Sequence, residues 1–362
     1  MSKFHKLKVS EVKNEIAEAV SVSFEVPEAL KQNFNYLPGQ YTTLKLSVNG
    51  ENVNRSYSFC SSPFMNEPLT IAVKRVDGGR GSNFINDNFK PGVEVEVMEP
   101  MGNFHSAISE TNEKHYYLFG GGSGITPVMA ILKSVLVKEP KSKVTLFYGN
   151  RNENSIIFKD KLEALSAQYG ERLKLVHVLD SPLGTWSSYL GPISKDVALK
   201  LLRENTNLSF HHAEFFICGP TPMMKNVEEA LGVLQIPKDR VHIEYFTAKA
   251  DEDKKAADVG TTVESAVPFT GRTKVKITYD GNTREFEVSE KETILEAALD
   301  AGYDPPYSCM VAACCTCRAK LISGKVEMDD RESLTDAEIA KGYVLTCQSH
   351  PKSHGIVLNY DM

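Results

Sequence analysis

The last sixth of this 362-residue chain holds five cysteines whose spacing suits metal chemistry. Cys309, Cys314 and Cys317 form the pattern Cys-x4-Cys-x2-Cys, and Cys347 follows after 29 residues. Four thiolates at this spacing are the ligand set of a two-iron, two-sulfur cluster, around which the loop supplies N–H groups to the sulfurs. The alternatives are a zinc site, for which two Cys-x2-Cys pairs would be expected, and unliganded buried thiols. We interpret these four cysteines as cluster ligands and Cys315 as a non-ligand.

A strand and a glycine-rich turn near the N-terminus have residue types that suit a pyrophosphate. The strand carries Arg55-Ser56-Tyr57-Ser58, and the turn spans residues 79–84. An arginine fork and the N–H groups at a helix start bind phosphate oxygens, and the turn opens a predicted helix over residues 83–89. Taken alone, the strand motif is normally a cross-strand pair and the glycine loop a turn. Only their combination indicates a cofactor site.

A second glycine loop, Gly120-Gly121-Gly122-Ser123-Gly124-Ile125-Thr126-Pro127, follows a predicted strand and opens a predicted helix. Its glycines let the backbone approach a pyrophosphate at the positive end of a helix, although the loop is not the Gly-x-Gly-x-x-Gly fingerprint. Cys218-Gly219-Pro220 ends a later strand, and the run 241–246 contains Glu244 and Phe246. Singly, these residues are equally a buried strand cysteine, a solvated glutamate and a core phenylalanine, so we weigh them as a set.

Arg151 bears on the choice of pyridine nucleotide. It follows a predicted strand over residues 143–149, where the adenosine ribose would lie. A cation there suits a 2′-phosphate, whereas an acidic residue would suit NADH. We therefore expect NADPH, and the alternative is that Arg151 is a solvated loop residue.

Three kinds of segment position these motifs. Short alternating runs broken by turn residues indicate a small antiparallel barrel, at residues 7–12, 41–48, 55–60, 69–76 and 93–98. Strands that alternate with helices then indicate βαβ units and a parallel sheet, with strands at 116–119, 143–149, 173–179, 214–218 and 241–246 and helices at 127–137, 158–169, 194–203 and 222–231. The tail has a strand pair, 274–279 and 284–288, then an amphipathic helix and the cysteine loop.

Residues 247–270 are predicted to be a linker. They hold eight charged residues and one aromatic, Phe269, so they cannot bury much surface.

The overall composition excludes several classes of protein. Hydrophobic residues make up 41% and charged residues 24%, which is ordinary for globular proteins. The net charge of −6 comes without a dense basic block, which argues against nucleic acid as the ligand. No apolar run approaches the ~18 residues of a membrane span, and the N-terminus lacks the apolar stretch of a signal peptide. We therefore expect a cytoplasmic protein, where thiols stay reduced.

Together and in this order, the first motifs resemble the ferredoxin–NADP reductase family. The resemblance implies that Arg55 and the backbone of residues 80–82 hold the flavin pyrophosphate, that Tyr57 packs on the isoalloxazine and that Ser58 hydrogen-bonds near its N5. The remaining positions that it places at this cofactor, expected to be FAD with FMN as the alternative, are Ala72, Val73, Lys74, Arg80, Gly81 and Ser82.

The same resemblance implies roles at the nucleotide. Cys218 would lie beside C4 of the nicotinamide, Glu244 would belong to the same site, and Phe246 would cover the flavin ring. With Ser58, Cys218 and Glu244 are the expected catalytic residues. The other expected nucleotide contacts are Gly121, Gly122, Ser123, Gly124, Thr126, Arg151, Gly219 and Pro220.

The tail resembles the plant-type 2Fe-2S ferredoxins and departs from their pattern at one position. Ala312 stands where the family's loops usually carry glycine. If that position needs a positive φ, alanine costs about 1 kcal/mol. We expect a slightly altered loop that still holds the cluster.

The resemblance implies a multidomain chain, with an FAD-binding β-barrel at 1–110, an NAD(P)-binding α/β domain at 111–246, the linker and a β-grasp ferredoxin at 271–362. This order is similar to the reductase components of multicomponent oxygenases, and most similar to the reductase subunits of phenylacetyl-CoA epoxidases. NADPH gives two electrons at once and the cluster accepts one, so a flavin must stand between them.

The implied partner is an oxygenase component, a di-iron monooxygenase. Alternative acceptors are a Rieske oxygenase, a steroid hydroxylase and a desaturase. A protein of another class, a redox-sensing electron store, would need impaired hydride transfer and would not lose its colour when NADPH is added without oxygen.

Overall fold

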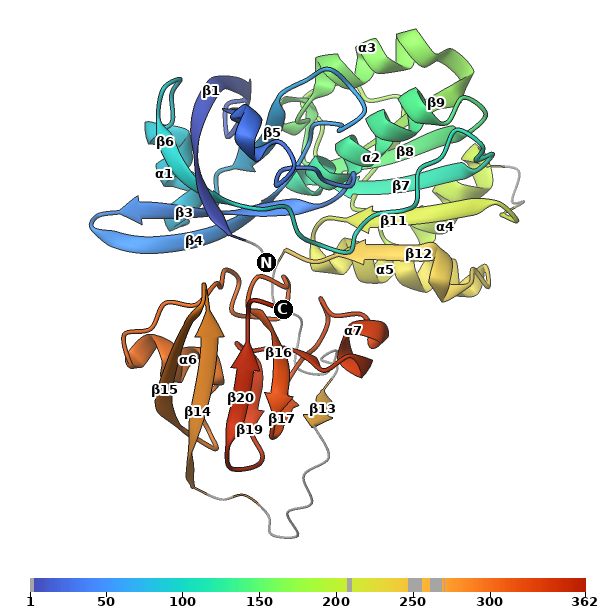
Figure 1. The fold of residues 1–362 in the computed structure, drawn as a ribbon. Helices are drawn as coiled ribbons and strands as arrows, with labels where there is room; N and C mark the ends of the chain where they lie inside the picture. Colours follow the sequence, from blue (N-terminus) through green and yellow to red (C-terminus); the bar gives the residue numbers. More distant parts are fainter. Residues whose placement is uncertain (1–2, 207–209, 247–255, 261–268, 270) are drawn as a thin grey trace.

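The computed structural model describes residues 3–206, 210–246, 256–260, 269 and 271–362, which form three units (Figure 1). The N-terminal and middle units lie side by side, and the C-terminal unit, orange to red in the figure, lies below both. Within the described parts of the chain, no helix has the length and apolar character needed to span a bilayer.

The N-terminal unit is a six-stranded antiparallel sheet in the order β4-β3-β6-β1-β2-β5. Its elements are β1 (Phe4–Ile16), β2 (Ala19–Glu25), η1 (Glu28–Leu30), β3 (Tyr41–Val48), β4 (Glu51–Ser58), β5 (Leu69–Lys74), α1 (Arg80–Asn88) and β6 (Glu94–Met98). The sheet curls so that its outer strands approach, because Phe59, directly after β4, bridges to Ile71 of β5. The expected antiparallel barrel is confirmed.

Two local expectations for the barrel were wrong. The predicted runs omit β2, whose apolar residues alternate with Ser21 and Ser23; both serines are buried, and their hydroxyls contact Glu15 at 2.8 Å and Thr70 at 2.9 Å. Satisfied hydroxyls thus let a strand bury both faces. Helix α1 begins at Arg80 rather than at residue 83, since the extended backbone at Gly79 already caps it.

The middle unit is a parallel sheet in the order β10-β9-β8-β7-β11-β12. Its strands are β7 (His115–Gly121), β8 (Lys143–Asn150), β9 (Leu173–Leu179), β10 (Tyr189–Leu190), β11 (Ala213–Cys218) and β12 (Val241–Glu244). Its helices are η2 (Gly122–Gly124), α2 (Ile125–Lys138), η3 (Glu153–Ser155), α3 (Lys159–Tyr169), η4 (Gly170–Arg172), α4 (Lys195–Asn205), α5 (Thr221–Val233) and η5 (Lys238–Arg240). Helices α2 and α3 share one core and α4 and α5 another, which confirms the expected βαβ architecture.

The C-terminal unit combines a five-stranded sheet, β15-β14-β20-β16-β18, with a three-stranded sheet, β13-β17-β19. Its elements are β13 (Ala257–Gly260), β14 (Arg272–Tyr279), β15 (Asn282–Ser289), α6 (Ile294–Asp300), β16 (Arg318–Ser323), β17 (Lys325–Met328), α7 (Asp336–Ala340), β18 (Tyr343–Leu345), β19 (Ser349–Pro351) and β20 (Ile356–Asn359). Strand β13 lies inside the predicted linker 247–270 yet pairs antiparallel with β17. Apart from residues 256–260 and 269, that segment lies outside the described residues.

A buried ion pair joins the barrel to the middle unit. Lys133 of α2 is 1% exposed, and its Nζ lies 2.5 Å from Oε1 of Glu67 in the barrel. The same carboxylate accepts the Ser62 N–H at 2.5 Å, and the Lys161 ammonium lies 3.6 Å from its other oxygen. An ion pair of this kind fixes the relative orientation of two units because the Lys133 ammonium is shielded from water and needs this carboxylate as its partner.

We expect Lys133→Met to lower stability by about 3 kcal/mol, since removal of one partner leaves the other charge poorly compensated. Thermal unfolding followed by calorimetry measures the loss. The matched control is Lys138→Met on the same helix, whose exposed ion pair with Glu110 contributes about 0–1 kcal/mol. Equal melting temperatures for the two variants would contradict the interpretation.

Candidate flavin, nucleotide and cluster site

A cavity of about 510 Å³ lies where the three units meet, within the range of cofactor sites. It is lined by many of the predicted residues: Arg55, Tyr57, Ser58, Ala72, Lys74, Arg80, Gly81, Ser82, Ser123, Thr126, Glu244, Phe246, Cys309 and Cys314. Further wall residues, to which no cofactor contact was assigned from the sequence, are Tyr41, Ser56, Val76, Gly78, Gly79, Tyr245 and Ala313. The fold therefore brings flavin, nucleotide and cluster motifs to a single cavity.

The start of α1 forms an anion-binding corner of this cavity. Its N-cap is Gly79, which offers no side-chain acceptor, so the first N–H groups of the helix remain for a ligand. A Cβ at Gly81 would lie 2.7 Å from Cγ of Arg55, so only glycine lets the helix start approach this arginine. The Ser82 hydroxyl accepts the Val76 N–H at 3.1 Å and thereby holds the turn. This donor set fits a pyrophosphate.

The part of the cavity wall that β4 supplies suits an aromatic cofactor ring. Tyr57 is half-buried, and burial raises its pKa despite the opposing charge of Arg55, so its ring stays neutral and apolar. Ser58 is buried at the end of β4 and lines the cavity. Val73 does not line it: its side chain is fully buried in the barrel core, and its carbonyl accepts from the Asn86 amide at 3.2 Å. Alternation along β5 sends it to the opposite face from Ala72 and Lys74.

The predicted nucleotide loop joins β7 to α2. Gly120 pairs with Cys218 where β7 and β11 lie side by side, the point at which the strand order reverses. Ligands of open parallel sheets bind beyond the strand ends at such a point. Gly121, Gly122, Gly124, Gly219 and Pro220 lie at these ends, beside the cavity-lining residues Ser123 and Thr126.

Gly124 has no room for a side chain. A Cβ built there would lie 2.1 Å from the Cys218 carbonyl oxygen and 2.7 Å from the Gly219 nitrogen. The backbone at Gly124 therefore packs directly against the Cys-Gly-Pro turn, so the loop and the turn form one continuous nucleotide site.

Cys218 and Glu244 are register partners at the ends of β11 and β12. Cys218 is fully buried, and burial, with Glu244 as a second cause, holds its pKa well above the usual range. Burial also raises the pKa of Glu244 to about 8, and Cys314 adds to the effect. A neutral thiol is a poor nucleophile, whereas a protonated carboxyl can donate a hydrogen bond. Glu244 lines the cavity, whereas Cys218 lies behind the wall, so of these two predicted catalytic residues only the carboxyl faces the space expected for the nicotinamide.

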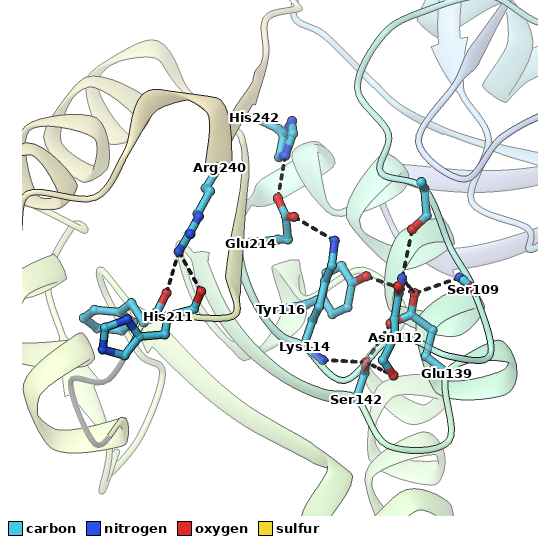
Figure 2. A network of polar contacts seen from close by, with 12 residues as sticks. Ser109, Asn112, Lys114, Tyr116, Glu139, Ser142, His211, Glu214, Arg240 and His242 are labelled. Atoms are coloured by element: carbon cyan, nitrogen blue, oxygen red, sulfur yellow. Dashed lines mark hydrogen bonds and ion pairs between the residues drawn. The ribbon is translucent and has the colours of Figure 1, made fainter.

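A polar network fixes the strand that carries Glu244 (Figure 2). The His242 ring nitrogen lies 3.0 Å from Glu214 of β11, which also accepts from Lys114 at 2.8 Å. Nearby, the buried Glu139 carboxylate accepts hydrogen bonds from hydroxyl and amide groups around the start of β7. The contact between His242 and Glu214 anchors β12 two residues before Glu244.

Of two further predicted residues, one lines the cavity and the other does not. Phe246 lines it and is 43% exposed, which leaves its ring free to cover a bound flavin. Arg151 is exposed, follows the carboxyl end of β8 and does not line the cavity. Burial raises the pKa of Asp180 and the nearby charge of Arg151 opposes this shift, so the two side chains are neighbours at the edge where an adenosine ribose would lie.

The four predicted cluster ligands gather in two pairs, in which the thiols of Cys309 and Cys314 contact each other, as do those of Cys317 and Cys347. Two thiolates for each of two irons is the arrangement that a 2Fe-2S cluster needs. Val311 N–H donates to Cys309 Sγ at 3.4 Å, and the Gln348 amide lies 3.8 Å from Cys347 Sγ. The residues present therefore fit the cluster.

The cluster loop has a positive φ at Ala312, the strained conformation that was considered for this position. Its φ is +56°, and that of Met310 is +59°, both in the left-handed region that favours glycine. Each costs about 1 kcal/mol or more. The Ala312 carbonyl accepts the Ser333 N–H at 3.2 Å, which helps to hold the strained turn.

Three protein families match successive parts of the chain. Residues 6–106 match the oxidoreductase FAD-binding domain, residues 118–229 the oxidoreductase NAD-binding domain, and residues 277–352 the 2Fe-2S iron-sulfur cluster binding domain.

Full-length relatives match the whole arrangement. A subunit of the 1,2-phenylacetyl-CoA epoxidase of Escherichia coli is 36% identical over 100% of this chain and 99% of its own. The ferredoxin reductase component of 3-ketosteroid-9-alpha-monooxygenase from Rhodococcus rhodochrous is 36% identical over 98% of this chain and 96% of its own. The solved structure of phthalate dioxygenase reductase is 26% identical, covers 98% of each chain and has a TM-score of 0.56. The chain belongs to the ferredoxin–NADP reductase-type electron-transfer components of oxygenases, with FAD- and NAD-binding domains and a C-terminal 2Fe-2S ferredoxin domain.

Proposed function

We propose that this protein transfers electrons from NADPH, through FAD and its 2Fe-2S cluster, to the di-iron oxygenase of a phenylacetyl-CoA epoxidase. Its family is that of NAD(P)H-dependent reductases; the choice of NADPH, the roles of single residues and the identity of the acceptor are the proposed parts. The cytoplasmic location expected from its reduced thiols likewise stays a prediction.

One observation carries the proposed path inside the protein. Cys309 and Cys314, the ligands proposed for one iron, line the same cavity as Ser58 and Glu244. A flavin bound there supplies the conversion between two-electron and one-electron chemistry. Ser58 and Glu244 would orient the nicotinamide against the flavin ring. The cysteine loop, which lines the same cavity, would also contact the flavin.

The proposed preference for NADPH rests on the exposed cation at the end of β8. We expect Arg151→Ala to raise the KM for NADPH by about 10- to 100-fold, because a charged hydrogen bond to a phosphate contributes about 1.5–3 kcal/mol. The KM for NADH should change less than about twofold, since that ribose carries no phosphate. Steady-state ferricyanide reduction with each nucleotide measures both constants. A parallel rise in the two values would contradict the assignment.

The proposed acceptor is supported by the 36% identity to a phenylacetyl-CoA epoxidase component over the whole chain. The test combines this protein, NADPH and the purified epoxidase core with phenylacetyl-CoA, and measures epoxidised product against NADPH oxidised. Cytochrome c reduction is the control for the electron-transfer chain. Product in step with NADPH oxidation would support the acceptor.

A second acceptor class is favoured by an equally similar relative. The reductase component of 3-ketosteroid-9-alpha-monooxygenase is also 36% identical, over 98% of this chain. Reduced cytochrome c without epoxide would reject the phenylacetyl-CoA assignment and direct the same assay to a steroid-hydroxylating oxygenase.

A further inference from the structure

One face of the flavin barrel is covered by the cysteine loop of the ferredoxin domain. Strand alternation places Tyr41, Thr43 and Lys45 of β3 on the same side, and Ser56 of β4 is the register partner of Thr43. We call these four residues the docking face. Tyr41 and Thr43 are buried to 4% and 0% exposure although they point away from the apolar core of the barrel.

Each residue of the docking face contacts a partner in or near the cysteine loop. The Tyr41 hydroxyl accepts the Cys315 N–H at 3.0 Å, Thr43 Oγ1 lies 3.1 Å from Thr316 Oγ1, Ser56 donates to Ser308 at 2.9 Å, and Lys45 donates to Asp304 at 2.7 Å. Three of the four partners, Ser308, Cys315 and Thr316, are sequence neighbours of a proposed cluster ligand. These three contacts therefore hold the ligand loop itself.

Tyr41 has a position that the other three lack. Its side chain belongs to the same apolar cluster as the ferredoxin core, and it lines the flavin cavity together with Cys314. Its hydroxyl lies 3.4 Å from Cys315 Sγ as well as accepting the amide of the same residue. A single side chain thus contacts the space for the flavin and the segment between two ligands of the cluster.

We propose that Tyr41 is a positioning residue for electron transfer from the flavin to the cluster, with its hydroxyl holding the loop segment between Cys314 and Cys317 at the cavity. Each transfer would move one electron from a reduced flavin to an oxidised cluster, and the cluster would pass that electron to the protein acceptor before taking the second electron of the same NADPH. Tyr41 gives up neither an electron nor a proton. The proposal rests on the family's order of electron carriers and not on the identity of the acceptor.

The test is Tyr41→Phe in the full-length, cofactor-loaded protein, with Tyr36→Phe as the matched control. Tyr36 is another barrel tyrosine, half-buried, whose hydroxyl contacts Ser61 at 2.7 Å within the barrel. Anaerobic stopped-flow absorbance separates flavin reduction by NADPH from the later reduction of the cluster. We expect the first phase to be unchanged in both variants and the second to slow by about tenfold or more in Tyr41→Phe alone, because a buried N–H loses its acceptor.

A spectroscopic readout separates positioning from general loosening. The freed Cys315 N–H lies beside ligand Cys314, and hydrogen bonds near the sulfurs tune a cluster's potential. We expect the cluster potential of Tyr41→Phe to move by about 30 mV or more, equivalent to an approximately threefold change at 59 mV per tenfold. The EPR spectrum of the reduced cluster should change with it, while Tyr36→Phe keeps the wild-type values.

The proposal fails if Tyr41→Phe keeps the wild-type rate and potential, or if Tyr36→Phe slows the cluster phase equally. Should Tyr41→Phe not load its cluster, Thr43→Val replaces it, since this change removes the contact with Thr316 at nearly constant volume. If Thr43→Val reduced its cluster at the wild-type rate, the proposed role of the docking face would be contradicted. Epoxidase assays play no part in these outcomes, so a wrong acceptor would leave them intact.

Discussion

Replacement of Cys347 by alanine is expected to abolish electron delivery to cytochrome c or an oxygenase while leaving NADPH-to-ferricyanide activity intact. Cys347 pairs with Cys317 and is separated from the other ligands by 29 residues, so its loss removes one iron's second thiolate. Loss of an outer contact alone costs about 10- to 100-fold in metal affinity, and loss of a ligand costs more. Ferricyanide accepts electrons directly from a flavin, which the barrel and middle unit would still hold.

Iron content, the visible spectrum and the two activities measure this result. The matched control is Cys60→Ala, which removes another buried thiol that lies on the barrel and outside the cavity. It should retain full iron and both activities. Persistence of cytochrome c reduction in Cys347→Ala would show that electrons bypass the cluster, and the proposed route would be wrong.

Replacement of Gly124 by alanine is expected to lower flavin reduction by NADPH by about a hundredfold or more. The added Cβ would meet the Cys218 carbonyl oxygen at 2.1 Å, and backbone on both sides cannot rotate away. The Cys218-Gly219-Pro220 turn and the loop after β7 must therefore separate. A misplacement of about 1 Å at a reacting pair costs about a hundredfold in rate.

The defect should be confined to the nucleotide. With dithionite in place of NADPH, the flavin and cluster of Gly124→Ala should be reduced as in the wild type. The matched control is Gly232→Ala in α5 of the same unit, where a Cβ meets nothing within 4 Å. It should keep the wild-type rate with NADPH. Normal NADPH-dependent reduction in Gly124→Ala would mean that this packing does not hold the nucleotide site.

Local sequence determined the parts of this site that lie within one loop or one strand end. The Cys-x4-Cys-x2-Cys spacing places three thiols on a single turn, so the ligand set could be predicted without the fold. The glycine loop between β7 and α2 could likewise be predicted, since the strand, the glycines and the helix start form one continuous segment of the chain. Alternation and the order of strands and helices likewise indicated the barrel and the parallel sheet, whereas the β-grasp unit was implied by the family resemblance.

Some local features were hidden because neighbours elsewhere in the fold decide them. Serines 21 and 23 look like the polar face of a strand, but partners from Glu15 and Thr70 allow their burial in β2. Val73 belongs to a correctly predicted strand, but the packing of β5 decides that its face, shared with Leu69 and Ile71, is the one turned to the core. Strand β13 has the composition of a linker, and its order comes from pairing with β17, a strand that lies far along the chain beyond the cysteine loop.

How the three sets of motifs meet depends on packing between distant segments of the chain. Tyr41 and Cys315 are 274 positions apart, and neither residue belongs to a motif that points to the other. Their contact exists because strand alternation directs Tyr41 outward while the ferredoxin sheet presents its cysteine loop to that face. The sequence motifs predict which residues hold each cofactor, since the chemistry of each motif is local. The packing of the three units determined that Cys309 and Cys314 share a cavity with Ser58 and Glu244, since contacts between segments so far apart in the chain leave no periodic signal.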